Sequence, residues 1–110
     1  MILSIDQGTT GTTVLVLDRR ARIVARAYTE LPQHYPQPGW VEHDPAEILL
    51  VTSQTIARAL STGHIAPRRL EAIGITNQRE TVILWDRRTG RPVANAIVWQ
   101  CRRTAPMCDR

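Results

Sequence analysis

The sequence contains no lysine and only two cysteines, Cys101 and Cys108, in 110 residues. The spacing of the two cysteines fits neither a Cys-x-x-Cys redox motif nor a zinc-ligand pattern. We therefore expect two reduced thiols, and neither a disulfide framework nor a structural metal site.

Long apolar runs are also missing. No stretch approaches the roughly 20 apolar residues that a membrane-spanning helix needs. The Met-Ile-Leu-Ser start lacks the basic region and long apolar core of a secretory signal. The sequence predicts a cytoplasmic protein without membrane insertion.

Acidic residues are fewer than basic ones, which gives a net charge of +4 and raises the question of a nucleic-acid partner. The arginines gather near predicted turns, and no aromatic residues alternate with them to stack on bases. The groups are Arg19, Arg20 and Arg22, then Arg68 and Arg69, then Arg87, Arg88 and Arg91. This distribution favours solvated turn charges, and no nucleic-acid partner is predicted.

A hydrophobic share of 43% supports one folded domain over residues 1–110. Residues 2–5, 12–17 and 23–30 are rich in side chains that favour extended backbone. A tight turn at 18–21 joins the last two segments, so the beginning of the chain is predicted to form a three-stranded meander.

A helix is predicted after the proline-rich segment 31–43. Asp44 suits the N-cap, Pro45 the first helical position, and Glu47 the third position of a capping box. Apolar residues at 48, 49, 51, 56, 57, 59 and 60 predict one buried face. Gly63 fits a left-handed stop at the end of the helix.

Further strands are predicted after this helix. Residues 72–75 suggest a buried strand that ends at Thr76, residues 81–93 a hairpin-like unit, and residues 96–98 a last apolar strand before another helical turn. Strands on both sides of a helix imply a crossover, hence an α/β sheet with some parallel pairs. Three apolar strands end in polar or aromatic groups, namely Asp6, residues 77–80, and Trp99 with Gln100. A site is therefore expected at the carboxyl ends of these strands.

Residues 6–11, Asp-Gln-Gly-Thr-Thr-Gly, lie between two predicted strands. Two glycines and two hydroxyls allow backbone N–H groups and threonine oxygens to gather around an anion, for which phosphate is the natural ligand. Asp6 would repel bare phosphate, so its expected role is to hold Mg²⁺, directly or through water, against the phosphoryl oxygens. A hairpin loop whose threonines cap its own backbone is the alternative.

Arg79 and Glu80 place a planar donor beside a carboxylate acceptor, which suits a substrate with neighbouring hydroxyls. The pair can converge only outside a regular strand, as its position after Thr76 allows. An exposed ion pair of little energetic weight is the alternative. Trp99 could form an apolar wall for a small polyol, although such a residue is more often part of a core. The other tryptophans, Trp40 and Trp85, are interpreted as packing residues, and His34, His43 and His64 as structural.

Four blocks together resemble the glycerol kinases of the FGGY carbohydrate kinase family, within the actin-like ATPase superfamily. They are residues 6–10, 38–45, 74–81 and 95–104, which cover DQGTT, PGWVEHDP, GITNQRET and NAIVWQCRRT. The first block is shared by many sugar kinases, and the last three in this order are specific to the glycerol group. The resemblance implies an actin-like, ribonuclease H-like α/β domain with a mixed sheet and flanking helices, incomplete at its C-terminal end.

The resemblance also implies the chemistry, which is transfer of the γ-phosphoryl group of ATP to glycerol, giving sn-glycerol 3-phosphate. Asp6 would lie near Mg²⁺, while Thr9, Thr10 and Gly11 would contact the ATP phosphates; Thr9 would also touch the product phosphate. Arg79 and Glu80 would hold glycerol hydroxyls, with Trp99 against the carbon backbone. Thr13 stands where members of the family carry an arginine, so the resemblance leaves open whether a cationic contact to the nucleotide phosphates is present.

No catalytic residue is expected in this segment, because the family's general base and its second, nucleotide-binding domain lie further along the chain. Residues 1–110 are thus interpreted as the amino-terminal part of the substrate-binding domain, inactive alone, from an enzyme that could form a homo-oligomer. A kinase for another polyol such as erythritol or dihydroxyacetone stays open, as do a non-catalytic actin-like nucleotide sensor or scaffold and a ribonuclease H-like nuclease. The nuclease would need more carboxylates at strand ends than Asp6 and Glu80 supply.

Overall fold

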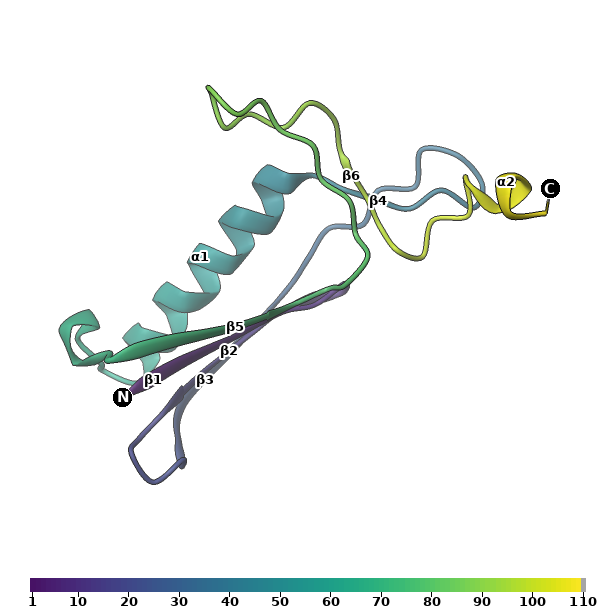
Figure 1. Cartoon of the computed structure of the whole chain (residues 1–110). Helices are drawn as coiled ribbons and strands as arrows, with labels where there is room; N and C mark the ends of the chain where they lie inside the picture. The colour runs from purple at the N-terminus through teal and green to yellow at the C-terminus, as the bar shows by residue number, and fades with distance from the viewer. Residues whose placement is uncertain (110) are drawn as a thin grey trace.

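A four-stranded sheet with one long helix across its face forms the body of the molecule (Figure 1). The computed structural model describes residues 1–109. The strands are β1 (Ile2–Gln7), β2 (Gly11–Leu17), β3 (Ile23–Glu30) and β5 (Ala72–Asn77), in the order β3-β2-β1-β5. The helix is α1 (Pro45–Thr62), and a 3-10 turn, η1 (Pro67–Arg69), leads from it into β5.

The meander is confirmed. β1 and β2 pair antiparallel, as do β2 and β3, and the tight turn closes where the N–H of Ala21 donates to the carbonyl of Asp18 at 3.0 Å. The predicted crossover is also present, because the chain returns through α1 and pairs β5 parallel to β1. This pairing makes the sheet mixed, with its one parallel pair beside the meander.

The core lies between this sheet and α1. Alternate residues of β1 and β2 point towards the helix and are buried, as the period of two in a strand requires. Buried residues of the cluster are Leu3, Ile5, Val14, Val16, Ala25, Ala27, Ala59 and Ile65. The buried face of α1 is narrower than its apolar residues predict, since Leu49 is 70% exposed and Ala57 is also exposed.

Two predicted details of the α1 ends are wrong. Asp44 does cap the helix, with its carboxylate accepting the N–H of Ala46 at 2.8 Å. Glu47, however, bonds to the His34 ring at 2.7 Å and does not close a capping box. Gly63 has a φ of −82°, and the left-handed residue is the following one, His64, with a φ of 49°.

The strand β5 is not buried, contrary to the prediction from its apolar residues. Every residue of β5 is exposed, including Ile73 at 60% and Ile75 at 71%. The reason is that α1 packs over β2 and β3 and leaves the β5 edge of the sheet uncovered within residues 1–109.

The segment after β5 leaves the sheet and extends past its end (Figure 1). Residues 82–93 form a hairpin-like loop with isolated bridges at Val82 and Trp85, and Trp85 is 60% exposed, so its interpretation as a packing residue is wrong. The last predicted strand is only β6 (Ala96–Ile97). It pairs with β4 (Glu42–His43) in a separate two-stranded sheet, and a short helix, α2 (Ala105–Cys108), follows. Within residues 1–109, no helix combines the length and apolar character needed to cross a bilayer.

Glycine is required at position 63 by the lack of space for a side chain and not by backbone conformation. This requirement gives a test of the packing of α1 on the sheet. A Cβ at Gly63 would lie 2.7 Å from the Cβ of Ala25 and 2.8 Å from Cδ1 of Ile65. We expect Gly63→Ala to destabilise the protein by about 1–3 kcal/mol, the usual cost of overpacking. Thermal unfolding measures this cost.

The matched control is Gly74→Ala in β5, where an added Cβ meets no atom within 4 Å. This change should leave the melting temperature unchanged or slightly raised, because alanine restricts the unfolded chain. Equal destabilisation by the two changes would contradict the packing described for α1.

Candidate functional site

The carboxyl ends of β1 and β5 leave the sheet side by side. Their register pairs Gln7 with Asn77, and the N–H of Gln78 continues the ladder by donating to the carbonyl of Gln7 at 2.8 Å. The turn at residues 8–10 and the turn at residues 79–80 therefore start from neighbouring points on the same edge, as expected for a site in a sheet with parallel strands.

The turn after β1 is closed by its own backbone, with the N–H of Gly8 donating to the carbonyl of Gly11 at 2.9 Å. Thr10 is exposed and Thr9 is half-buried. Gly11 is buried, and a Cβ there would lie 2.5 Å from the carbonyl oxygen of Thr29, so the approach of β3 requires glycine at this position. Close packing thus accounts for Gly11 without any ligand.

Asp6 is exposed and alternates with the buried Leu3 and Ile5, which places its side chain on the sheet face opposite α1. Its cross-strand partner is Thr13, whose side chain must share that face. Thr13 therefore stands directly beside Asp6.

Arg79 and Glu80 lie in a turn and not on the strand, and both are exposed. Glu80 has a φ of 64°, in the left-handed region that a non-glycine residue occupies at a cost of about 1–3 kcal/mol. This conformation breaks the alternation of a strand, as convergence of the two side chains requires. Strained residues of this kind cluster at ligand sites.

Trp99 reaches the turn after β1 from the far end of the chain. Its indole Nε1 donates a hydrogen bond to Oγ1 of Thr9 at 2.8 Å, and 53% of the residue stays exposed. A threonine hydroxyl that accepts one hydrogen bond keeps its own hydrogen to donate. The contact therefore leaves Thr9 able to donate to an anion while an indole face borders the same edge.

An ion pair holds the segment that carries Trp99. Arg103 donates to Glu42 at 2.6 Å with both side chains largely buried, and its guanidinium stacks 3.8 Å from the ring centre of Trp40. The Arg103 hydrogen bond lowers the pKa of Glu42, while Glu42 raises the pKa of Arg103. Together with the β4–β6 pairing, this contact joins residues 39–43 to residues 95–103.

A chain of amide and imidazole groups, with His43 and Gln78 buried and Gln33 half-buried, runs beneath the edge. Gln33 donates from Nε2 to the carbonyls of Thr9 and Leu31 at 2.9 and 3.0 Å. Its Oε1 lies 2.9 Å from Nε2 of His43, and Nδ1 of His43 lies 3.2 Å from Nε2 of Gln78. The chain thereby links the turn after β1 to the residue that precedes Arg79.

The direction of each bond in this chain fixes the state of His43. Because Gln33 uses its amide nitrogen on two carbonyls, its Oε1 must accept from Nε2–H of His43, and Nδ1 then accepts from Gln78. The Oε1 of Gln78 accepts from Thr81 at 2.8 Å, so its amide is oriented as well. His43 is fully buried, and burial, followed by the charge of His34, lowers its pKa. The neutral imidazole is the form that satisfies every partner.

The structure thus brings two of the predicted site residues, Thr9 and Trp99, into contact. The turn that holds Arg79 and Glu80 begins next to the turn that holds Thr9. Sequence reasoning missed Gln33 and Gln78 and treated His43 as merely structural. Only a weak signal for the burial of His43 was available in the sequence. Val41 and His43 are two residues apart in an extended segment, so their side chains lie on the same side of the chain. Within residues 1–109 no group of three or more His, Cys, Asp or Glu side chains could hold a metal ion.

The chain was compared with known protein families and solved structures. Residues 1–110 match the N-terminal domain of the FGGY family of carbohydrate kinases. The chain belongs to this family.

Its relatives include a glycerol kinase of Carboxydothermus hydrogenoformans, 55% identical over 98% of this chain. Among solved structures, a Plasmodium falciparum glycerol kinase with ADP is 40% identical, with a TM-score of 0.90 over 98% of this chain and 22% of its own. A xylulose kinase of Rhodospirillum rubrum is 26% identical, with a TM-score of 0.84 over 97% of this chain and 22% of its own. The chain spans 22% of the length of the first of these relatives. The mixed α/β architecture of this actin-like kinase family is thereby confirmed for the segment.

The lowered pKa of His43 predicts a pH dependence of stability. The unfolded chain takes up a proton near the ordinary pKa of 6.5, whereas the folded protein resists it. The stabilisation is complete above that value and is lost as the pH falls towards the folded pKa. Urea unfolding between pH 7.5 and 5 should show a falling free energy of unfolding.

The comparison variant is His43→Gln, which offers one donor and one acceptor but cannot be protonated. It should be less stable at pH 7.5 and show a shallower fall with pH than the natural protein. Parallel pH curves for the two proteins would show that His43 is not held neutral.

Proposed function

We propose that this chain is the amino-terminal, substrate-binding part of an ATP-dependent glycerol kinase. The reaction is transfer of the γ-phosphoryl group of ATP to a terminal hydroxyl of glycerol, giving sn-glycerol 3-phosphate. The observation that carries the proposal is the hydrogen bond from Trp99 to Thr9, because it brings an exposed indole next to the turn that we propose to bind phosphate. The similarity to glycerol kinases supports the choice of substrate.

Glycerol would be bound by the turn at residues 79–80 and by Trp99. The guanidinium of Arg79 donates to one hydroxyl, while the carboxylate of Glu80 accepts from its neighbour. The carbon backbone then lies against the exposed indole face of Trp99. Three contacts of different chemistry fix the orientation of a molecule with only three carbons, which sets the terminal hydroxyl for transfer.

The phosphates of ATP would meet the turn after β1. The hydroxyls of Thr9 and Thr10 and nearby backbone N–H groups, including that of Gly11, donate to phosphoryl oxygens, and Thr9 afterwards contacts the product phosphate. The exposed carboxylate of Asp6 would suit Mg²⁺, which commonly keeps several waters and takes one or two carboxylates together with substrate phosphates. When bound, Mg²⁺ neutralises charge that develops on the transferred group.

This segment contributes positioning and charge, and the proton acceptor for the attacking hydroxyl is assigned to the part of the enzyme outside residues 1–110. Because ATP is an intracellular substrate, the proposal places the reaction in the cytoplasm. A homo-oligomer of the natural-length protein is compatible with the proposal, which does not depend on it.

The test is substitution of the two polyol-binding residues in the protein at its natural length. Arg79→Ala and Glu80→Gln should each lower kcat/KM for glycerol about 10- to 100-fold, since a hydrogen bond to a charged group contributes about 1.5–3 kcal/mol. The KM for ATP should change little. Steady-state kinetics with glycerol and ATP varied separately measure both effects.

Arg87→Ala is the matched control, because Arg87 is an exposed arginine on the hairpin-like loop. It should leave kcat/KM unchanged. A panel with xylulose, erythritol and dihydroxyacetone tests the rival polyol kinases: preference for any of them over glycerol would overturn the proposal, as would unaltered kinetics in the Arg79 and Glu80 variants.

A further inference from the structure

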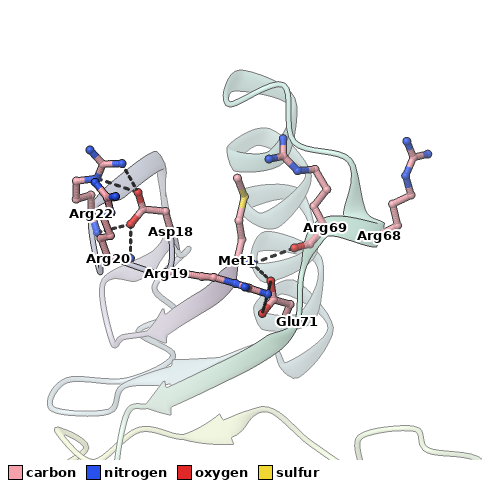
Figure 2. Close-up of a pocket in the computed structure, with 8 residues that line it drawn as sticks. All are labelled: Met1, Asp18, Arg19, Arg20, Arg22, Arg68, Arg69 and Glu71. Carbon is pink, nitrogen blue, oxygen red and sulfur yellow. Dashed lines mark hydrogen bonds and ion pairs between the residues drawn. The ribbon is translucent and has the colours of Figure 1, made fainter.

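A second concave site lies at the other end of the sheet, where β1 begins (Figure 2). The cavity has a volume of about 670 Å³ and is walled by Met1, by the turn between β2 and β3, and by the η1 segment that leads into β5. Its lining contains five arginines, Arg19, Arg20, Arg22, Arg68 and Arg69, and two carboxylates, Asp18 and Glu71. Each β1 residue advances about 3.3 Å, so this end lies roughly 20 Å from the candidate kinase site.

Both carboxylates are already occupied. Asp18 accepts the N–H groups of Arg20 and Arg22 at 2.8 and 3.0 Å and the guanidinium of Arg22 at 2.8 Å. Glu71 accepts the amino group of Met1 at 2.9 Å and the guanidinium of Arg19 at 3.3 Å. The backbone bond from Arg22 lowers the pKa of Asp18, and the bond from the Met1 amino group lowers the pKa of Glu71. These bonds hold the lining side chains in place and pair both carboxylates of the cavity with cations or N–H groups.

Three arginines remain. The ion pairs formed within residues 1–109 leave Arg20, Arg68 and Arg69 without a carboxylate partner. In Figure 2, Arg20 lies on one rim beside Arg22, and Arg68 and Arg69 lie on the opposite side, with the Met1 side chain between the two groups. The cations are therefore spread around a hollow and do not converge on one point.

We propose that this cavity binds a small polyanion that carries at least two phosphate groups. A guanidinium binds phosphate through paired N–H donors, and these charge-assisted bonds are strong and directional. A ligand with two or more phosphate groups can place one near each group of arginines. The volume lies in the usual range for small-molecule sites. This inference is independent of the proposed kinase function.

The test is binding of inorganic tripolyphosphate to the natural-length protein, measured by isothermal titration calorimetry. The amino terminus must carry no tag, because the Met1 amino group bonds within the lining. The double variant Arg20→Ser/Arg69→Ser should weaken binding at least tenfold, and Arg68→Ser alone should weaken it less. Thermal unfolding of each variant confirms that these exposed changes leave the fold intact.

The matched control is Arg87→Ser/Arg88→Ser, which removes the same charge from the hairpin-like loop and should bind as the natural protein does. Equal weakening in both double variants would show a general charge effect and overturn the proposal. Thr9→Val separates the two sites: loss of tripolyphosphate binding in that variant alone would assign it to the kinase site and contradict the inference. Citrate, a tricarboxylate, should bind more weakly than tripolyphosphate, and equal or tighter binding of citrate, of a DNA duplex or of anionic vesicles would also overturn it.

Discussion

The parallel pairing of β5 with β1 fixes where the strand ends of the candidate site lie relative to each other. The meander and its covering helix could form from contacts near in sequence, but only this pairing places Gln78 against Gln7. The polar chain through Gln33 and His43 then ties the two strand ends together from below. Because buried polar groups are costly when unpaired, this chain of hydrogen bonds favours the observed arrangement of the two strand ends over shifted ones.

The two ends of the sheet differ in charge and in shape. At the carboxyl end, a chain of amides and an imidazole bonds to the turn that contains Thr9, and Trp99 bonds to the Thr9 hydroxyl. At the amino end, arginines surround a hollow whose carboxylates are already bonded. The two proposed sites therefore lie at opposite ends of one short sheet and do not overlap.

Local signals carried most of the fold prediction. The meander, the Asp44 cap and the α1 crossover follow from side-chain periodicity and turn residues, which act over a few positions. The errors arise where a distant segment decides: Gly63 is small because Ala25 is close, and Glu47 bonds to His34 instead of its own helix. The exposure of β5 depends on where α1 crosses the sheet. The residue pattern within β5 contains no information about that position.

The candidate site shows the same difference between local signals and contacts of distant segments. Polar residues at strand ends could be recognised from sequence, and the family resemblance assigned roles to them that remain proposals here. The contact of Trp99 with Thr9 could not be predicted, because it depends on the pairing of β6 with β4 and on the Arg103–Glu42 ion pair. The hydrogen-bond direction through His43 likewise exists only once three separate segments have met.

The most direct measurement is a crystal structure of the natural-length protein with glycerol and a non-hydrolysable ATP analogue. We expect glycerol hydroxyls within hydrogen-bond distance of Arg79 and Glu80, glycerol carbons against Trp99, and the terminal phosphate at the turn that contains Thr9. Glycerol bound elsewhere, or Arg79 and Glu80 directed away from the Thr9 turn, would contradict it.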